Sequence, residues 1–317
     1  MNFSSISIDE DYYTLEKDIV AKDHIEFISI NKIFETALAV ALCISSTTSN
    51  LIVICSIFCV SSRTHVLDFY IMSITTTNLL ITVVVIPFSI AAKSDLLGVY
   101  SFLFCSISGY LHVSLSAVYM YTFMWMSVDR YLARRKSCRY DVIQTRTRCK
   151  CWILFSWVMA TCLCCPPLIG DSKGHFYAES FICLLNIRSM LPYCITLGCL
   201  VLIPSISTLC FTYFHIFTTP DMGVKDEVAG FNSDHIATFM VTVGFNILWT
   251  PWGVLRILEL ISSKILANPT SRFWLLFLGE MHTLWTPIAL LSWYRRCQTG
   301  LRLIFRCCIK SQTTVPL

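Results

Sequence analysis

Seven long apolar runs are the feature that most constrains how this chain can fold. Each run is long enough, as a helix, to cross a hydrocarbon core of about 30 Å. The apolar residues are continuous rather than alternating with polar ones, which argues against membrane-spanning strands. Only 14% of the 317 residues are charged, against roughly a quarter in soluble domains. We therefore expect an all-α membrane protein, a seven-helix bundle with spans at 33–60, 66–92, 101–128, 150–169, 191–217, 234–261 and 272–294.

The placement of Lys and Arg predicts the orientation of the bundle. With the N-terminus outside, the inner segments hold fifteen basic residues and the outer segments hold eight. Short loops rich in Lys and Arg remain in the cytoplasm, so we expect an extracellular N-terminus in the plasma membrane. Residues 1–32 are acidic and contain no apolar core, so we expect an extracellular tail and no cleaved signal peptide. Asn2 in Asn-Phe-Ser fits an N-glycosylation acceptor.

One transmembrane domain, residues 33–294, should be followed at 295–317 by an amphipathic helix and a cytoplasmic tail. Apolar residues between 301 and 305 alternate with Arg302 and Arg306, which predicts an eighth helix lying on the membrane. Cys307 and Cys308 behind it are candidate palmitoylation sites. The inner segment 218–234 contains Pro and Gly and is expected to be a turn-rich connector.

Most of the 17 cysteines lie within the spans, where Cys behaves as a small apolar residue. Two do not. Cys105 stands at the outer start of the third span, and Cys183 lies in the middle of the second outer loop. Both face an oxidising compartment, which favours a disulfide that fastens this loop to the third helix. Two unpaired thiols are the alternative.

Nearly every span carries one or two polar or helix-breaking residues, which are weak signals singly. They are Asn50, Asn78, Asp129-Arg130-Tyr131, Trp157 with Pro166-Pro167, Pro204, Phe245 to Pro251 including Trp249, and Thr286-Pro287. In this order they resemble the rhodopsin-like (class A) G-protein-coupled receptors, over about residues 33–308. Four short segments extend the resemblance to the orphan receptors twenty-one and fifty-two, at Ser127–Ala133, Cys210–Phe217, Ile247–Pro251 and Asn268–Thr270.

The resemblance implies an orphan-type receptor that passes an extracellular signal to a heterotrimeric G protein. The orphan pair is associated with stimulatory G proteins, so we expect Gs and cAMP. Asp129 and Arg130, with Tyr131, would form the inner switch. The residues implied as the activation relay are Phe245, Trp249, Pro251, Pro204, Pro287, Asn50 and Asn78. The eight basic residues from Arg130 to Lys150 fit either a contribution to the G-protein contact or a topology signal with lipid contacts.

The chain also departs from the family pattern. Asn78 replaces the usual Asp in the second span, and the sodium-site positions read Tyr119, His282 and Thr286. An amide lacks the charge that holds Na⁺, so we predict no sodium pocket. The usual acid that restrains Arg130 is replaced by Phe231, which leads us to expect raised basal signalling. The seventh span lacks the usual Asn and Tyr, which favours inefficient coupling instead.

Five residues mark a candidate ligand pocket: His112, Glu280, Trp252, Arg256 and Glu259. The aminergic Asp is replaced by His112 and the opsin Lys by Glu280, which disfavours amines anchored there and excludes retinal. The pair formed by His112 and Glu280 is read as a structural hydrogen bond, a ligand anchor or a proton sensor. Arg256 and Glu259 either pair with each other or recognise a charged ligand. Trp252 and Trp285 are expected to add aromatic walls.

Other classes of protein fit less well. The spans show no inverted repeat for a transporter, and no metal-ligand spacing or buried carboxylate pair for an enzyme. We expect no cofactor, no metal and no nucleic acid. The partners expected are a G protein, an unknown extracellular ligand and membrane lipids. A receptor fold that couples weakly or not at all, as a decoy or accessory protein, stays open.

Overall fold

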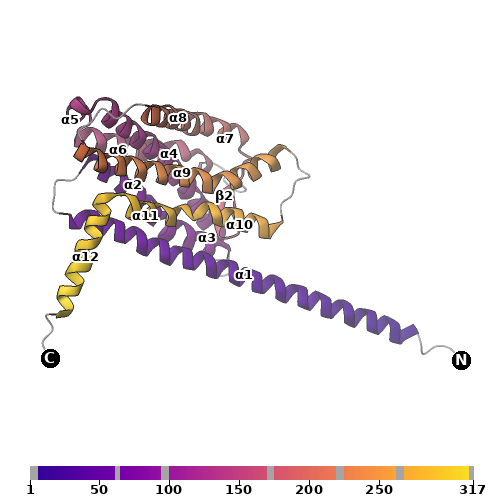
Figure 1. Ribbon diagram of the computed structural model, residues 1–317. Helices are drawn as coiled ribbons and strands as arrows, with labels where there is room; N and C mark the ends of the chain where they lie inside the picture. The colour runs from indigo at the N-terminus through magenta and orange to yellow at the C-terminus, as the bar shows by residue number, and fades with distance from the viewer. Residues whose placement is uncertain are drawn as a thin grey trace. The chain divides into compact units, whose positions relative to one another are not determined.

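The computed structural model describes the backbone of residues 6–60, 65–93, 100–169, 175–218, 225–261 and 268–313. Within these helices, side chains are described except at 6–30, 93, 137, 225–232 and 307–313. The chain divides into two units, Met1–Ala41 and Leu42–Leu317, and each is described by itself. From Ile6 in the first unit to Cys59, the backbone forms one continuous helix (Figure 1).

The helices and the two strands follow one another as α1 (Ile6–Cys59), α2 (Val66–Leu80), η1 (Ile81–Val85), α3 (Ile86–Lys93), α4 (Ser101–Arg135), η3 (Ser137–Arg139), α5 (Tyr140–Ile143), α6 (Arg146–Cys164), η4 (Pro166–Leu168), β1 (Phe176–Glu179), β2 (Ile182–Leu185), α7 (Leu191–Leu197), η5 (Gly198–Leu202), α8 (Ile203–Thr218), α9 (Lys225–Ile261), α10 (Pro269–Glu280), α11 (His282–Trp293) and α12 (Arg295–Thr313). All seven predicted spans fall on helical segments. The amphipathic eighth helix corresponds to α12.

Six helical stretches in the described part of the chain are long and apolar enough to cross a membrane. The remaining span is α6, a helix of 19 residues that begins with Arg146, Arg148 and Lys150. Basic residues at the inner end of a span extend toward the headgroups, so they lower the mean hydropathy of α6 without preventing it from crossing. Pro166 and Pro167 follow this helix and end it, because proline cannot continue the backbone hydrogen bonds.

Two helix boundaries differ from the expectation. The helix of the first span begins at Ile6, well before residue 33. The helix of the sixth span begins at Lys225, within the segment expected to be a turn-rich connector. Once a helix has formed, each further residue adds a hydrogen bond at little cost, and Gly230 opposes this by only about 1 kcal/mol.

Helix α4 is the centre of the second unit. It packs against α2, α3, α6, α8 and α9, while α9 also packs against α10 and α11 (Figure 1). Aromatic side chains such as Tyr119 and Phe123 are fully buried along α4. The indole of Trp157 in α6 donates to Ser73 Oγ in α2 at 3.0 Å. The most buried residues therefore line the faces of α4, α2 and α11.

Prolines widen two of the helices. Pro87 and Pro204 each follow one π-helical turn, η1 and η5. A proline ring clashes with the carbonyl of the preceding turn and offers it no amide, so an extra residue in that turn relieves the clash. The carbonyl of Leu200, four residues before Pro204, accepts the hydroxyl of Tyr121 from α4 at 3.2 Å.

The second outer loop contains an antiparallel hairpin, β1–β2, in which Glu179 pairs with Ile182. Ser180 in the two-residue turn has a φ of 52°, the positive value that such tight turns need. On β1, Phe176 lies so close to α4 that a Cβ at Gly109 would meet its ring at 2.4 Å. This hairpin was not expected from the sequence.

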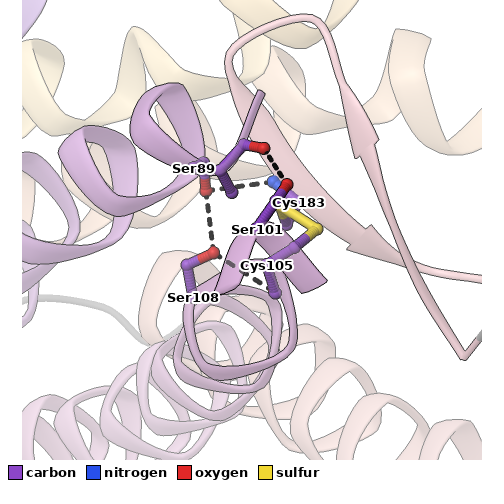
Figure 2. The surroundings of a disulfide bond; sticks show 6 residues. Ser89, Ser101, Cys105, Ser108 and Cys183 are labelled. Atoms are coloured by element: carbon purple, nitrogen blue, oxygen red, sulfur yellow. Dashed lines mark hydrogen bonds between the residues drawn. A yellow bond between two sulfur atoms is a disulfide. The ribbon is translucent and has the colours of Figure 1, made fainter. Parts of the chain in front are cut away.

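The predicted disulfide is present and joins Cys183 on β2 to Cys105 on α4, with 5.3 Å between the Cα atoms. Figure 2 shows serine hydroxyls arranged around it. Ser89 Oγ donates to Ser108 Oγ at 3.0 Å and accepts the backbone amide of Cys183 at 3.0 Å. The bridge and these hydrogen bonds fasten the hairpin to the outer ends of α3 and α4.

Candidate receptor site

At the inner end of α4, the Asp129 and Arg130 side chains form a buried ion pair. Arg130 Nε donates to Asp129 Oδ2 at 2.9 Å, and Arg130 as a whole is only 6% exposed. Tyr140, on the short helix α5, donates its hydroxyl to Asp129 Oδ1 at 2.8 Å. Burial raises the pKa of the Tyr140 phenol, so it stays protonated and acts as a donor. The Asp129 carboxylate thus has a partner at each oxygen.

The expectation that Arg130 lacks an acidic partner from helix six is wrong. Asp234 Oδ2 on α9 lies 3.8 Å from Arg130 Nη1. Asp234 follows Phe231 by three residues, about one helical turn, and therefore faces the same side of α9. Relative to the family pattern, the acid stands one helical turn later in the chain. A comparison at the position of Phe231 alone therefore does not find it. The side chain of Phe231 lies outside the described residues.

Tyr131, the third residue of the predicted switch, points toward a different helix. Its ring lies 5.9 Å from that of Phe211 and 6.0 Å from that of His215, both on α8. Asp129 and Arg130 therefore make their contacts at the inner end of α4, whereas Tyr131 packs against α8.

An aromatic cluster lies in the middle of the bundle, where α4, α9 and α11 meet. Phe245 stacks on Tyr119 at 5.1 Å between ring centroids and contacts Phe123 at 5.3 Å. Trp249, one turn farther out on α9, donates its indole N–H to His282 Nδ1 at 3.2 Å. His282 also contacts the rings of Tyr119 and Phe245. His282 is therefore a shared neighbour through which a movement of Trp249 would shift Phe245.

Two of the predicted relay residues are prolines inside helices, Pro251 in α9 and Pro287 in α11. Pro287 has no amide to offer the carbonyl of Thr283, four residues earlier. That carbonyl instead accepts Asn50 Nδ2 at 2.9 Å and Ser46 Oγ at 3.1 Å. The proline thereby creates the acceptor that ties the first span to the seventh.

The positions that complete a sodium site in most relatives carry an uncharged hydrogen-bond network in this chain. Asn78 Nδ2 donates to Asn50 Oδ1 at 2.9 Å, and the Tyr119 hydroxyl donates to Asn78 Oδ1. Thr286 Oγ1 turns back to the carbonyl of His282 at 2.9 Å. Across the described residues, no group of three or more His, Cys, Asp or Glu side chains is arranged to hold a metal ion.

Toward the outer side, His112 on α4 and Glu280 at the end of α10 meet across the bundle. His112 Nε2 lies 2.9 Å from Glu280 Oε1, and both side chains are buried. The other carboxylate oxygen, Oε2, has no hydrogen-bond partner among the described residues. The His112 ring is 5.7 Å from that of Trp249. The pair is therefore in contact with the aromatic cluster.

The charged residues of the outer part of α9 form a wider network than a single pair. Arg256 Nη1 donates to Glu259 Oε2 at 2.8 Å, as one of the two expected readings has it. Arg272 at the start of α10 donates to Glu259 Oε1 at 2.7 Å and to Glu179 on β1 at 3.1 Å. Trp252 is 6% exposed, and its ring lies 5.7 Å from the Arg256 guanidinium. The network joins the hairpin to α9 and α10.

Trp285 does not line the candidate pocket, contrary to the expectation. Its indole donates to the backbone carbonyl of Met240, in the inner half of α9, at 2.9 Å. The rotation of α11 about its axis decides which helix the Trp285 ring contacts. The position of Trp285 in the sequence does not show this rotation.

Several functional candidates were missed in the sequence. Asp68 in the first turn of α2 is fully buried and accepts the Tyr294 hydroxyl at 2.7 Å. Arg296 Nε at the start of α12 lies 3.0 Å from the other Asp68 oxygen. A lone acid near the end of an apolar span was the available signal, because charged groups there are costly unless paired. Tyr140 carried no comparable signal.

Three of the predicted modification sites fall outside the described residues. They are the glycosylation site Asn2 and the palmitoylation sites Cys307 and Cys308. For the two cysteines, only the backbone of α12 is described.

Comparison with known proteins agrees with this architecture. Residues 49–289 match the family model of the 7 transmembrane receptor (rhodopsin family). The mouse G-protein coupled receptor 52 is 29% identical over 262 residues, covering 76% of this chain and 72% of that protein. The human Probable G-protein coupled receptor 21 is 25% identical over 247 residues, covering 72% and 71%. The fruit-fly Octopamine receptor Oamb is 28% identical over 127 residues, 39% of this chain and 20% of that receptor.

The predicted likeness to receptors twenty-one and fifty-two is therefore confirmed. The family consists of receptors rather than enzymes, and its members signal through heterotrimeric G proteins. With seven helical spans, the outer disulfide and a match over most of its length, this chain is a multi-pass membrane protein that belongs to the rhodopsin family of seven-transmembrane receptors.

Proposed function

We propose that this receptor signals through a stimulatory G protein and cAMP, with Arg130 as the residue that engages the C-terminal helix of the Gα subunit. The observation that carries the proposal is the buried guanidinium of Arg130, held at the inner end of α4 by Asp129 and approached by Asp234. A buried charge whose partners lie on two helices changes its environment when those helices separate. The choice of Gs rests on the resemblance to receptors twenty-one and fifty-two.

The expectation of raised basal signalling assumed that no acid lies near Arg130. Asp234 does lie near it, so that assumption no longer holds. We propose instead that Asp129, Tyr140 and Asp234 together hold Arg130 at rest. Outward movement of α9 would carry Asp234 away and leave Arg130 free to turn toward the G protein.

We propose that the signal reaches this switch from a ligand site at the level of His112 and Glu280. His112 contacts Trp249, Trp249 donates to His282, and Phe245 packs against His282. One turn outward from His112, Gly109 lies beneath Phe176 of the hairpin. A ligand with a hydrogen-bond donor suits Glu280, because the Oε2 atom of that carboxylate has no partner among the described residues. The ionic network around Glu259 would border this site on the α9 side.

The proposal is tested by measuring activation of each G-protein class in cells that express the receptor at a known surface level. Because the contact of Arg130 with Asp234 is long and partly exposed, it restrains Arg130 only weakly. We therefore expect a small ligand-free cAMP signal above that of mock-transfected cells, or G-protein recruitment under Gs overexpression. Arg130→Ala should abolish the signal while surface expression stays unchanged. Activation of another G-protein class, again lost in Arg130→Ala, would refute the choice of Gs but retain Arg130 as the switch.

A second candidate, a receptor fold with weak or no coupling, is favoured by the inner half of α11. Leu290 is buried where most relatives have a Tyr, and Thr286, which stands where they have an Asn, donates its hydroxyl to the carbonyl of His282 in its own helix. If no G protein is activated by the wild-type receptor, and Arg130→Ala behaves identically, this second function replaces the first.

We also propose a plasma-membrane location with the N-terminus outside. A disulfide favours an oxidising compartment for the hairpin. The basic residues at the end of α4 and at the starts of α6 and α12 favour the cytoplasm for the opposite ends of the helices. An epitope tag before Met1 should bind antibody on intact cells, whereas a tag after Leu317 should require permeabilisation. The reverse pattern would overturn the orientation.

A further inference from the structure

Trp285 on α11 forms a direct contact with the backbone in the inner half of α9. The indole Nε1 donates to the carbonyl of Met240 at 2.9 Å. In an α-helix this carbonyl also accepts the amide of the residue four positions later, here Gly244. The indole therefore shares the carbonyl with the helix and must reach the backbone of α9 itself.

Gly244 is what permits this approach. A Cβ at position 244 would lie 1.9 Å from Trp285 Nε1 and 2.3 Å from its Cδ1. No side chain tolerates such distances, so the indole and any residue other than glycine exclude each other. Glycine within a helix costs about 1 kcal/mol relative to alanine, and here it provides a notch that the indole occupies.

Two further polar contacts tie α9 to α11 on either side of the notch. Ser233 Oγ, at the inner end, donates to the backbone carbonyl of Trp293. Trp249, farther out, donates to His282 Nδ1. By comparison, the ion pair of Arg130 with Asp234, which joins α4 to α9 at the inner end, is long, at 3.8 Å. The inner half of α9 is thus held more closely by α11 than by α4.

We propose that Trp285 is a positioning residue that holds the inner half of α9 against α11 and so opposes the outward movement that admits a G protein. This inference rests on the proposed function, because the movement matters only if the receptor couples. The indole acts through two features, its N–H donor and the fit of its ring into the Gly244 notch. A separate substitution tests each of these two features.

The first test removes the donor and keeps an aromatic ring. Trp285→Phe should raise ligand-free G-protein activation about two- to tenfold, the range expected when one hydrogen bond is lost. Trp274→Phe is the matched control, since Trp274 lies on the same span but is 47% exposed. Equal basal activity in wild type and Trp285→Phe, in a receptor that Arg130→Ala shows to be coupled, would overturn the proposal.

The second test asks whether Trp285 and Gly244 act as one contact. Gly244→Ala should also raise basal activity, because the added methyl group displaces the indole. In a Trp285→Ala background no ring remains to be displaced, so Gly244→Ala should then add less than twofold. Equal effects of Gly244→Ala in both backgrounds would refute the notch. If the alanine variants do not reach the cell surface, Trp285→Phe alone decides.

The third test is independent of coupling. Hydrogen–deuterium exchange of the purified receptor should increase across residues 233–248 in Trp285→Phe and stay at the wild-type level in Trp274→Phe. If no variant activates any G protein, the proposed function fails, and exchange alone decides the inference. Increased exchange then supports a tether between α9 and α11, whereas unchanged exchange overturns it.

Discussion

Arg130 on α4 and Asp234 on α9 face each other at the inner end of the bundle, with 3.8 Å between Nη1 and Oδ2. The acid stands one helical turn beyond Phe231, and we propose that the restraint on the arginine is shifted rather than lost. The distance is long for an ion pair, and the Asp234 side chain is 27% exposed. We expect such a contact to bias the resting state while staying weak enough to open.

Asp234→Asn should raise ligand-free G-protein activation by up to about fivefold, because a partly exposed ion pair contributes about 1 kcal/mol or less. Asp234→Glu keeps the charge and should remain near the wild type. The measurement is cAMP accumulation at matched surface expression. Identical basal signalling in the Asn and Glu variants would mean that Asp234 does not restrain Arg130.

Glu280→Ala should lower the thermal stability of the purified receptor, because it leaves His112 without its buried partner. Breaking one side of a buried pair costs about 3–5 kcal/mol. The double variant His112→Ala/Glu280→Ala should lose less than the sum of the two single losses. Unfolding midpoints of all four proteins give this comparison. Additive losses would show that the two residues stabilise the receptor independently.

Replacing NaCl by choline chloride should leave both the unfolding midpoint and the basal activity of the receptor unchanged. Asn78 provides no negative charge, and its side chain is already engaged with Asn50 and Tyr119. A stabilisation by Na⁺ that choline does not reproduce would contradict the prediction. Asn78→Asp serves as the comparison, since it restores a carboxylate at this position.

Cys105→Ser and Cys183→Ser should each destabilise the receptor by about 2–4 kcal/mol, since either change opens the only bridge that the described residues contain. The hairpin carries Glu179, so its contact with Arg272 should weaken as well. Cell-surface expression and thermal unfolding measure the loss. Cys199→Ser, at an exposed thiol on η5, is the matched control and should have little effect.

Asp68→Asn should loosen the start of α12, because Asp68 accepts the Tyr294 hydroxyl and lies beside Arg296. We expect faster hydrogen–deuterium exchange in residues 294–300 and a lower unfolding midpoint. Tyr294→Phe removes one of the same contacts and should show part of the effect. Unchanged exchange in both variants would show that α12 is held by other contacts, such as the close approach of Gly300 to Ser56.

Much of the fold follows from residues read one at a time. A run of apolar side chains long enough to cross the bilayer must be helical, because only a helix satisfies its own backbone hydrogen bonds in hydrocarbon. The pairing of Cys105 with Cys183 was likewise accessible, since one cysteine stands at the predicted outer start of the third span and the other in the second outer loop. The hairpin between β1 and β2 was not, because four-residue strands leave little periodic signal.

The candidate site depended more strongly on tertiary contacts. The sequence places Asp129 beside Arg130 whatever the fold, and it indicates the family. It does not show that Asp234 takes over from Phe231, that Trp285 enters the notch of Gly244, or that Asp68 binds Tyr294.

Hydropathy and helical periodicity determine where each helix lies in the chain and which ends are charged. The rotation and axial shift of one helix against another are set by packing between residues far apart in the sequence. A shift of one turn, about 5.4 Å, changes which side chains meet. The sequence by itself therefore determined the seven spans, their bridge and the charged pair of the switch, and only the tertiary structure decided which neighbours restrain that pair.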